Sequence, residues 1–195
     1  MSAKGKAMIF KRKIYDELLE WKRTDNGKTA VLIQGARRVG KSTVAEEFAT
    51  NEYDSHILVD FAACSNEIKE LFNDISDLNR IFVRLQLEYG IELKERKSAI
   101  IFDEIQLAPK ARQAIKYLVK DGRYDYIETG SLISIRRNVK DILIPSEEVK
   151  LYMYPMDYEE FRWAMGDTAT IRLLRNWFHC RNSLGDDTNR KLMRD

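Results

Sequence analysis

The residues best suited to chemistry form a glycine-rich run, GARRVGKST, directly after an apolar stretch. Two glycines, a lysine and a serine in this run satisfy the phosphate-loop pattern GxxxxGK[ST]. The glycines let successive backbone N–H groups point inward at phosphate oxygens, with the positive end of the following helix behind them. We therefore expect every residue of the loop to contribute to binding a nucleotide: Gly35, Ala36, Arg37, Arg38, Val39, Gly40, Lys41, Ser42 and Thr43.

Two carboxylates follow another apolar run, in the sequence AIIFDEIQ. We expect Lys41 to reach the β and γ phosphates of ATP, and the Ser42 hydroxyl and the Asp103 carboxylate to hold Mg²⁺. Glu104 is placed to orient and polarise an attacking water. A single strand-end acid often only caps the next helix. The pair downstream of a phosphate loop favours ATP hydrolysis over binding alone.

Hydroxyl and guanidinium groups follow a fourth apolar run. Thr129 and Ser131 flank Gly130, and one of their hydroxyl groups could sense the γ-phosphate or the attacking water. Alternatively, residues 129–131 could form a turn in which Ser131 caps a helix. Arg136 or Arg137 could stabilise charge on phosphate in this or a neighbouring subunit. Solvated surface arginines are the commoner case.

The phosphate loop also carries two arginines, Arg37 and Arg38, at variable positions. Phosphates in such loops are held by backbone N–H groups and the lysine, so these side chains are expected to project away from the nucleotide. They either pair with nearby helices or contact a partner subunit or a nucleic-acid backbone.

Strand and helix patterns alternate along residues 1–155. The expected strands cover 30–33, 57–61, 98–102, 124–127 and 149–154, and the expected helices cover 14–21, 44–49, 68–75, 77–88 and 109–122. This alternation predicts a three-layer α/β fold, a mostly parallel five-stranded sheet with helices on both faces. Residues 1–155 would form this core with an N-terminal helix, and residues 156–195 a helical extension.

The extension has no strand pattern, and its last residues, 183–195, predict either a flexible end or a helix without its packing partner. It is basic, which fits either a solvated helix face or contact with nucleic acid. The basic residues are Arg162, Arg172, Arg175, Arg181, Arg190, Lys191 and Arg194.

Bulk composition narrows the class of protein. The formal net charge of +2 gives no global basic field, and no apolar stretch approaches the roughly 18 residues of a membrane span. A cytoplasmic protein without membrane contact is expected. Cys64 and Cys180 lack zinc-site spacing, and only His56 and His179 accompany them, so both cysteines are expected to be structural.

The motifs together resemble the AAA-type, STAND-like ATP-binding proteins of bacteria and archaea. The likeness covers nearly the whole chain: GARRVGKST, IIFDEIQ, ETGSL, and PMDYEEF, which is similar to the family's PLxxxEF stretch. It implies an ASCE-type core, with an extra strand between the two that bear the phosphate loop and the acidic pair. It also implies an ATP-driven switch or motor, with Glu104 as catalytic glutamate, Thr129 as first sensor and Arg37 as a usual loop residue.

The chain departs from that family in two places. Residues 144–148, IPSEE, stand where many relatives have a glycine-arginine pair, which leaves the sensing arginine unassigned. Relatives also continue past the position of Asp195 into a second domain. A truncated chain or a natural fragment is therefore expected, and the nuclease activity suggested for that domain is not carried over.

Three functions are compatible with these residues. The first is a Mg²⁺-dependent ATPase whose cycle rearranges an unknown protein partner or the missing C-terminal domain, as a monomer or a homo-oligomer. The second is a small-molecule kinase, against which the acidic pair argues because a hydrolytic glutamate wastes ATP. The third is a nucleotide-binding module without efficient turnover that engages DNA or protein.

Overall fold

The computed structural model describes residues 10–131, 147–180 and 185–192. Its internal contacts divide the chain into two compact units, Met1–Pro155 and Met156–Asp195. All five strands lie in the first unit, and the second contains only helices among the described residues.

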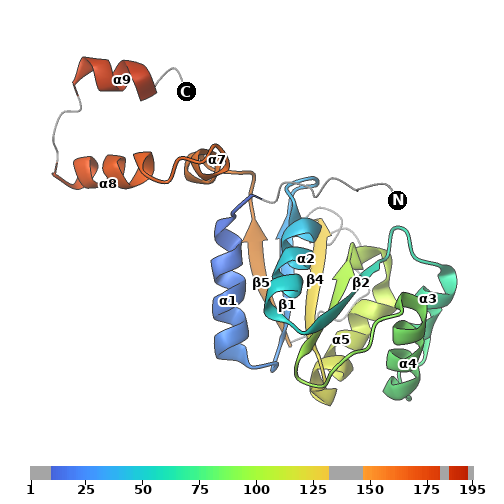
Figure 1. Ribbon diagram of the computed structural model, residues 1–195. Helices are drawn as coiled ribbons and strands as arrows, with labels where there is room; N and C mark the ends of the chain where they lie inside the picture. The colour runs from blue at the N-terminus through green and yellow to red at the C-terminus, as the bar shows by residue number, and fades with distance from the viewer. Residues whose placement is uncertain (1–9, 132–146, 181–184, 193–195) are drawn as a thin grey trace, which may run out of the picture. The chain divides into compact units, whose positions relative to one another are not determined.

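The first unit is built on a sheet of five parallel strands in the order β2-β3-β4-β1-β5 (Figure 1). The strands are β1 (Ala30–Gly35), β2 (Ser55–Asp60), β3 (Ser98–Asp103), β4 (Asp125–Ser131) and β5 (Glu148–Met153). Every residue of β1 and β3 is buried, as expected for central strands covered on both faces. β4 lies between β1 and β3, so the expected extra strand is confirmed.

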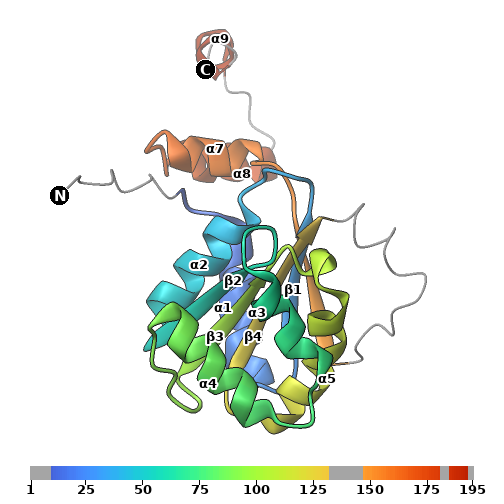
Figure 2. The ribbon, with the colours of Figure 1, turned by 90° about the vertical axis from the view of Figure 1, so that its right-hand side faces the viewer.

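Helices cover both faces of the sheet, and Figure 2 shows α2 on one side and α5 on the other. The first face packs against α1 (Lys13–Asp25) and α2 (Lys41–Glu52). The opposite face packs against α3 (Asn66–Glu70), the 3₁₀ turn η1 (Leu71–Asn73), α4 (Leu78–Tyr89) and α5 (Pro109–Asp121). The predicted three-layer α/β fold is confirmed.

Local sequence signals account for the helix boundaries. The Asp77 side chain accepts a hydrogen bond from the Arg80 N–H and begins α4, and Pro109 begins α5 at a position that needs no donor. Gly90 and Gly122 end these helices in the left-handed conformation.

One predicted helix, over residues 68–75, is confirmed only in part, because it ends at Asn73. The structure has the short α3 and η1 there, and Asp74 is extended. The Asp74 carboxylate accepts hydrogen bonds from the backbone N–H (3.0 Å) and the hydroxyl (2.6 Å) of Ser76. These local bonds satisfy the backbone in a turn and compete with helix formation.

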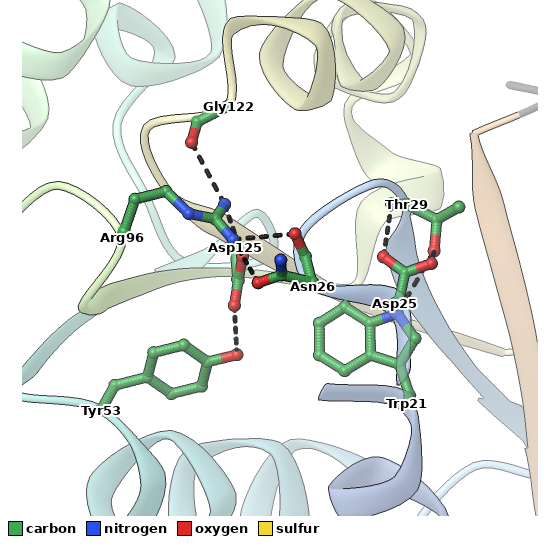
Figure 3. Close-up of polar contacts among 8 residues, drawn as sticks. All are labelled: Trp21, Asp25, Asn26, Thr29, Tyr53, Arg96, Gly122 and Asp125. Carbon is green, nitrogen blue, oxygen red and sulfur yellow. Dashed lines mark hydrogen bonds and ion pairs between the residues drawn. The ribbon is translucent and has the colours of Figure 1, made fainter. Parts of the chain in front are cut away.

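A polar network joins the connections at the amino ends of the strands (Figure 3). Arg96 donates to the carbonyl oxygens of Asn26 (2.8 Å) and Gly122 (3.2 Å), and Tyr53 donates to Asp125 (2.8 Å). The network therefore ties the α1–β1 and α5–β4 connections together. It lies at the edge of the sheet opposite the carboxyl ends of the strands.

The second unit contains three helices, α7 (Tyr158–Ala164), α8 (Thr170–Cys180) and α9 (Asp186–Leu192), among its described residues. α7 begins at a capping box in which Asp157 and Glu160 each bond the other's backbone N–H. Hydrogen bonds from Thr170, together with Arg162, hold the pKa of Asp167 well below its ordinary value. No residue of α8 is buried.

The cysteines differ in their surroundings. Cys64 is half-buried and touches the core, but Cys180 is exposed, so a packing role is wrong for Cys180. Neither forms a disulfide bond. Among the described residues, no helix has the length and hydropathy required to cross a bilayer.

Candidate functional site

The predicted motifs meet at the carboxyl edge of the sheet, and their meeting point is one oxygen atom. The Ser42 hydroxyl donates to Oδ1 of Asp103 (2.6 Å), and the Thr129 hydroxyl donates to the same oxygen. These three side chains come from the start of α2 and the ends of β3 and β4. Parallel pairing of β1, β4 and β3 brings these chain segments to one edge although they lie far apart in the sequence.

The phosphate loop occupies the connection from β1 to α2. Arg38 (φ 63°) and Gly40 (φ 96°) adopt positive φ, which turns the backbone sharply before the helix begins. Successive N–H groups in such alternating conformations form a concavity that binds anions. The two positive-φ residues are the kind of backbone turn that such a concavity contains.

Lys41 is the first residue of α2 and is only 5% exposed. Its ammonium donates to the carbonyl oxygen of Ala36 (2.7 Å), which keeps the side chain folded along the loop. Burial lowers the pKa of Lys41, while the nearby carboxylates of Glu104 and Asp103 oppose this by favouring the charged form. A buried ammonium beside loop N–H groups suits an anionic ligand.

Glu104 directly follows β3 and has positive φ (53°), uncommon for a residue with a side chain. Its backbone N–H donates to the Thr129 hydroxyl (3.3 Å), and its carboxylate accepts a hydrogen bond from the Gln106 amide. Both bonds restrict how the Glu104 carboxylate can point. Gln106 was not singled out from the sequence, because an amide two residues from a glutamate has no diagnostic spacing.

The turn interpretation of residues 129–131 is wrong. β4 continues through Ser131, which is paired with Gly35, so residues 129–131 form the end of a strand. A helix that Ser131 could cap would lie in residues 132–146, outside the described residues. Arg136 and Arg137 lie outside the described residues. Arg37 and Arg38 are exposed, and neither makes an ion pair with any described residue.

Sequence reasoning also missed Arg12, which is 7% exposed. It donates to the carbonyl oxygen of Val39 in the phosphate loop (2.8 Å) and to that of Tyr154 just after β5 (2.6 Å). Arg12 stands between two lysines near the start of the chain, and no spacing rule separates it from its neighbours.

The donor set fits a hard divalent cation held together with phosphate. Ser42 and Asp103 offer adjacent hydroxyl and carboxylate oxygens, the ligand type that Mg²⁺ prefers. The described residues contain no group of three or more His, Cys, Asp or Glu side chains suited to a metal. Mg²⁺ is commonly bound by one or two protein oxygens, with substrate phosphates and water completing its shell.

This strand order, with a phosphate loop after β1 and an acidic pair at the end of β3, defines an ASCE-type P-loop ATPase domain. The family model described as an AAA domain matches residues 27–162. The chain belongs to this AAA domain family. The match spans all five strands and every site residue predicted from the sequence.

Three solved structures are similar in fold. C. elegans PCH-2 is 12% identical, with a TM-score of 0.45 over 86% of this chain and 49% of that chain. The Pif1 helicase from Candida albicans is 15% identical, with a TM-score of 0.41 over 94% of this chain and 47% of that chain. The structure of Drosophila ORC bound to AT-rich DNA and Cdc6 is matched at 12% identity, with a TM-score of 0.49 over 93% of this chain and 74% of that chain.

This chain spans about half the length of the first two of these proteins. No curated protein matches the sequence.

Proposed function

We propose that this nucleotide-binding ATPase module hydrolyses Mg²⁺-ATP and uses the cycle as a switch on a partner or an attached domain. The observation that carries this proposal is the convergence of Ser42 and Thr129 on one oxygen of Asp103, beside Lys41 and Glu104. A turn that merely resembled a phosphate loop would not require its serine to meet an acid 61 residues away.

Each side chain then has a separate role. The N–H groups of the loop and the Lys41 ammonium bind the phosphates, and Ser42 and Asp103 hold Mg²⁺. When bound, Mg²⁺ neutralises charge on the phosphate oxygens. Thr129 fixes Asp103 by donating to it, and its oxygen also accepts the Glu104 N–H.

Glu104 is the proposed group that orients the attacking water and accepts its proton. Its hydrogen bond from Gln106 and its bonded backbone restrain the carboxylate near the end of β3. This restraint supports hydrolysis over transfer to an acceptor. A kinase would need to keep such a carboxylate from activating water.

We further propose that residues 1–155 are the ATPase core and that residues 156–195 form a helical region that responds to it. The exposed apolar side chains of α8, including Leu173 and Phe178 (83% exposed), support a protein partner or a further domain for this region. ATP and ADP are the ligands of the core, and homo-oligomerisation would supply an arginine in trans.

The test is phosphate release from the full chain with Mg²⁺-ATP over a range of protein concentrations, alongside direct measurement of ATP binding. We expect Lys41→Ala to lose both activities, and Glu104→Gln to keep binding while turnover falls by at least about 10²-fold. Lys116→Ala and Glu88→Gln, at exposed positions, are the matched controls.

Unchanged turnover in Glu104→Gln would overturn the assignment of that residue. Tight binding without turnover at any concentration would indicate a nucleotide-binding module, and an acceptor-dependent ADP burst would indicate a kinase. Turnover that rises faster than linearly with protein concentration would indicate an assembling ATPase.

A further inference from the structure

We propose that Arg12 is a positioning residue of the nucleotide site, which fixes the phosphate loop and links it to the backbone that leaves β5. The inference rests on the proposed nucleotide binding. The guanidinium Nη1 donates to the Val39 carbonyl (2.8 Å) and Nη2 donates to the Tyr154 carbonyl (2.6 Å). One side chain therefore joins segments that lie 27 and 142 residues away from it.

The chemistry of arginine suits this position. Its planar guanidinium presents several N–H donors in a rigid fork, so one side chain can bond two carbonyl groups in fixed directions. Arg12 is almost completely buried, and a buried charge is stable only with hydrogen-bonding partners. A lysine at this position has a single flexible ammonium and could not impose both directions at once.

The bond to Val39 has a direct consequence for phosphate binding. In a trans peptide the carbonyl of Val39 and the N–H of Gly40 belong to one planar unit and point in opposite directions. Arg12 therefore aims the Gly40 N–H away from itself by holding the Val39 oxygen. A charged donor on the carbonyl also polarises the peptide, which makes its N–H a stronger donor to an anion.

The loop also packs tightly against the end of β5. Gly35 pairs with Met153, and a β-carbon on Gly35 would lie 2.1 Å from the Met153 carbonyl oxygen. A β-carbon on Gly40 would lie 3.6 Å from the end of the Met153 side chain and 3.7 Å from Arg12 Nη1. The start of the loop is thus in tight contact with Met153, and Arg12 and the Met153 side chain lie beside Gly40.

Nucleotide binding should consequently restrict the backbone at Tyr154. Tyr154 immediately precedes Pro155, the last residue of the first unit. A ligand that holds the Gly40 N–H also holds the Val39 carbonyl, because the two groups belong to one peptide unit. Arg12 bonds this carbonyl and that of Tyr154, so it transmits the constraint from one to the other. Coupling of this kind is reciprocal, so a change at Tyr154 would alter nucleotide affinity by the same factor.

The experiment compares full-length wild type with Arg12→Ala, Arg12→Lys and the control Arg23→Ala. Arg23 lies on the adjoining helix α1, but its side chain is 75% exposed and pairs only with Glu20 among the described residues. Three quantities are measured: Kd for ADP and ATP, the melting temperature, and hydrogen exchange of the segments 36–43 and 150–156 with and without ADP.

In wild type and Arg23→Ala, ADP is expected to slow exchange in both segments. Arg12→Ala should raise Kd about tenfold, comparable to losing one charged hydrogen bond. At saturating ADP, the Arg12→Ala variant should still show slowed hydrogen exchange in the loop, but ADP should no longer slow exchange in residues 150–156. Arg12→Lys should fall between the two because it retains one donor group.

A lower melting temperature in Arg12→Ala with unchanged Kd and unchanged ADP-dependent protection would overturn the inference and leave Arg12 a structural residue. If Arg12→Ala does not fold, Arg12→Lys decides by the same criteria. Absence of ADP and ATP binding in wild type would refute the proposed function and this inference together. Normal wild-type binding with no effect of Arg12 substitutions would refute this inference alone.

Discussion

Gly35 and Met153 are in contact through their backbones: a β-carbon on Gly35 would lie 2.1 Å from the carbonyl oxygen of Met153. The two residues are paired in the parallel ladder between β1 and β5, at the point where the phosphate loop begins. Glycine is therefore required at the first position of the loop by the close approach of the neighbouring strand.

Gly35→Ala is accordingly expected to separate β1 from β5 locally. Overpacking of this kind lowers the free energy of unfolding by about 1–3 kcal/mol, and the displaced loop should also lose nucleotide affinity. Urea unfolding and nucleotide titration measure the two effects. Gly90→Ala serves as a comparison: a new β-carbon there has nothing within 4 Å, so this variant should lose stability only through its positive φ (65°) and should keep its nucleotide affinity. Tight nucleotide binding by Gly35→Ala would contradict the expectation.

Thr129→Val tests the hydroxyl that donates to Asp103. Valine preserves the branched shape within β4, but Asp103 and the Glu104 N–H each lose a hydrogen-bonding partner. Loss of a hydrogen bond to a charged group should reduce ATP turnover by about 10- to 100-fold, with a smaller change in ATP affinity. Steady-state phosphate release and nucleotide titration separate the two quantities. Thr50→Val, which removes an exposed hydroxyl bonded to the Glu46 carbonyl, serves as control.

Turnover of Thr129→Val equal to that of wild type would show that this hydroxyl does not support the acidic pair. A loss of stability alone, without a change in turnover per folded molecule, would assign Thr129 to folding.

Much of the fold could be predicted because its signals are local. Pro109 and Gly122 mark the ends of α5 by their own backbone preferences, and the apolar run of β3 predicts a covered strand. The phosphate loop and the acidic pair were likewise recognisable from spacing.

The remaining features depend on contacts between distant segments. Arg12 bonds carbonyl groups in the phosphate loop and after β5, and Gln106 holds a side chain whose position is set by β3. Nothing in the local sequence distinguishes these residues from surface ones. The helix expected over 68–75 ends at Asn73 for another reason, because the Asp74 carboxylate bonds Ser76 in a turn that the apolar spacing does not indicate.

Tyr53→Phe tests the network at the amino ends of the strands (Figure 3). The Tyr53 hydroxyl donates to the Asp125 carboxylate (2.8 Å), and burial together with Asp125 raises the pKa of Tyr53. Losing a hydrogen bond to a charged, largely buried acceptor should lower the free energy of unfolding by about 1.5–3 kcal/mol. ATP turnover per folded molecule should not change, because the network lies at the opposite edge of the sheet.

Urea unfolding measures the loss, with Tyr117→Phe at an exposed position as control. Equal stability of the two variants would show that the Tyr53–Asp125 bond contributes nothing in solution.

A buried acid in β4 should make the stability of the protein depend on pH. Glu128 is fully buried, and neither carboxylate oxygen has a hydrogen-bonding partner among the described residues. Burial raises the pKa of Glu128 well above its ordinary value, the nearby Glu148 raises it further, and Arg112 of α5 opposes both. Arg112 is paired with Glu148 (3.1 Å), which also lies near Lys150. The positive charge of Arg112 therefore only partly offsets the rise in the pKa of Glu128.

The folded chain therefore retains a proton on Glu128 that the unfolded chain releases near the ordinary pKa of 4.5. This contribution to stability is complete below that value and is lost as pH rises toward the folded-state pKa. Each tenfold difference in proton affinity between the folded and unfolded chains corresponds to about 1.4 kcal/mol. Glu128→Gln mimics the protonated acid without titrating. It should match wild type near pH 4.5 and be more stable at pH 8, as measured by urea unfolding.

Part of the pH dependence should persist in Glu128→Gln because burial also raises the pKa of Glu148. Glu88→Gln, at an exposed position on α4, should follow wild type at every pH. A stability difference between Glu128→Gln and wild type that stays constant from pH 4.5 to pH 8 would show that Glu128 has the same pKa in the folded and unfolded chain. Water reaching the Glu128 carboxylate would then offset the cost of its burial.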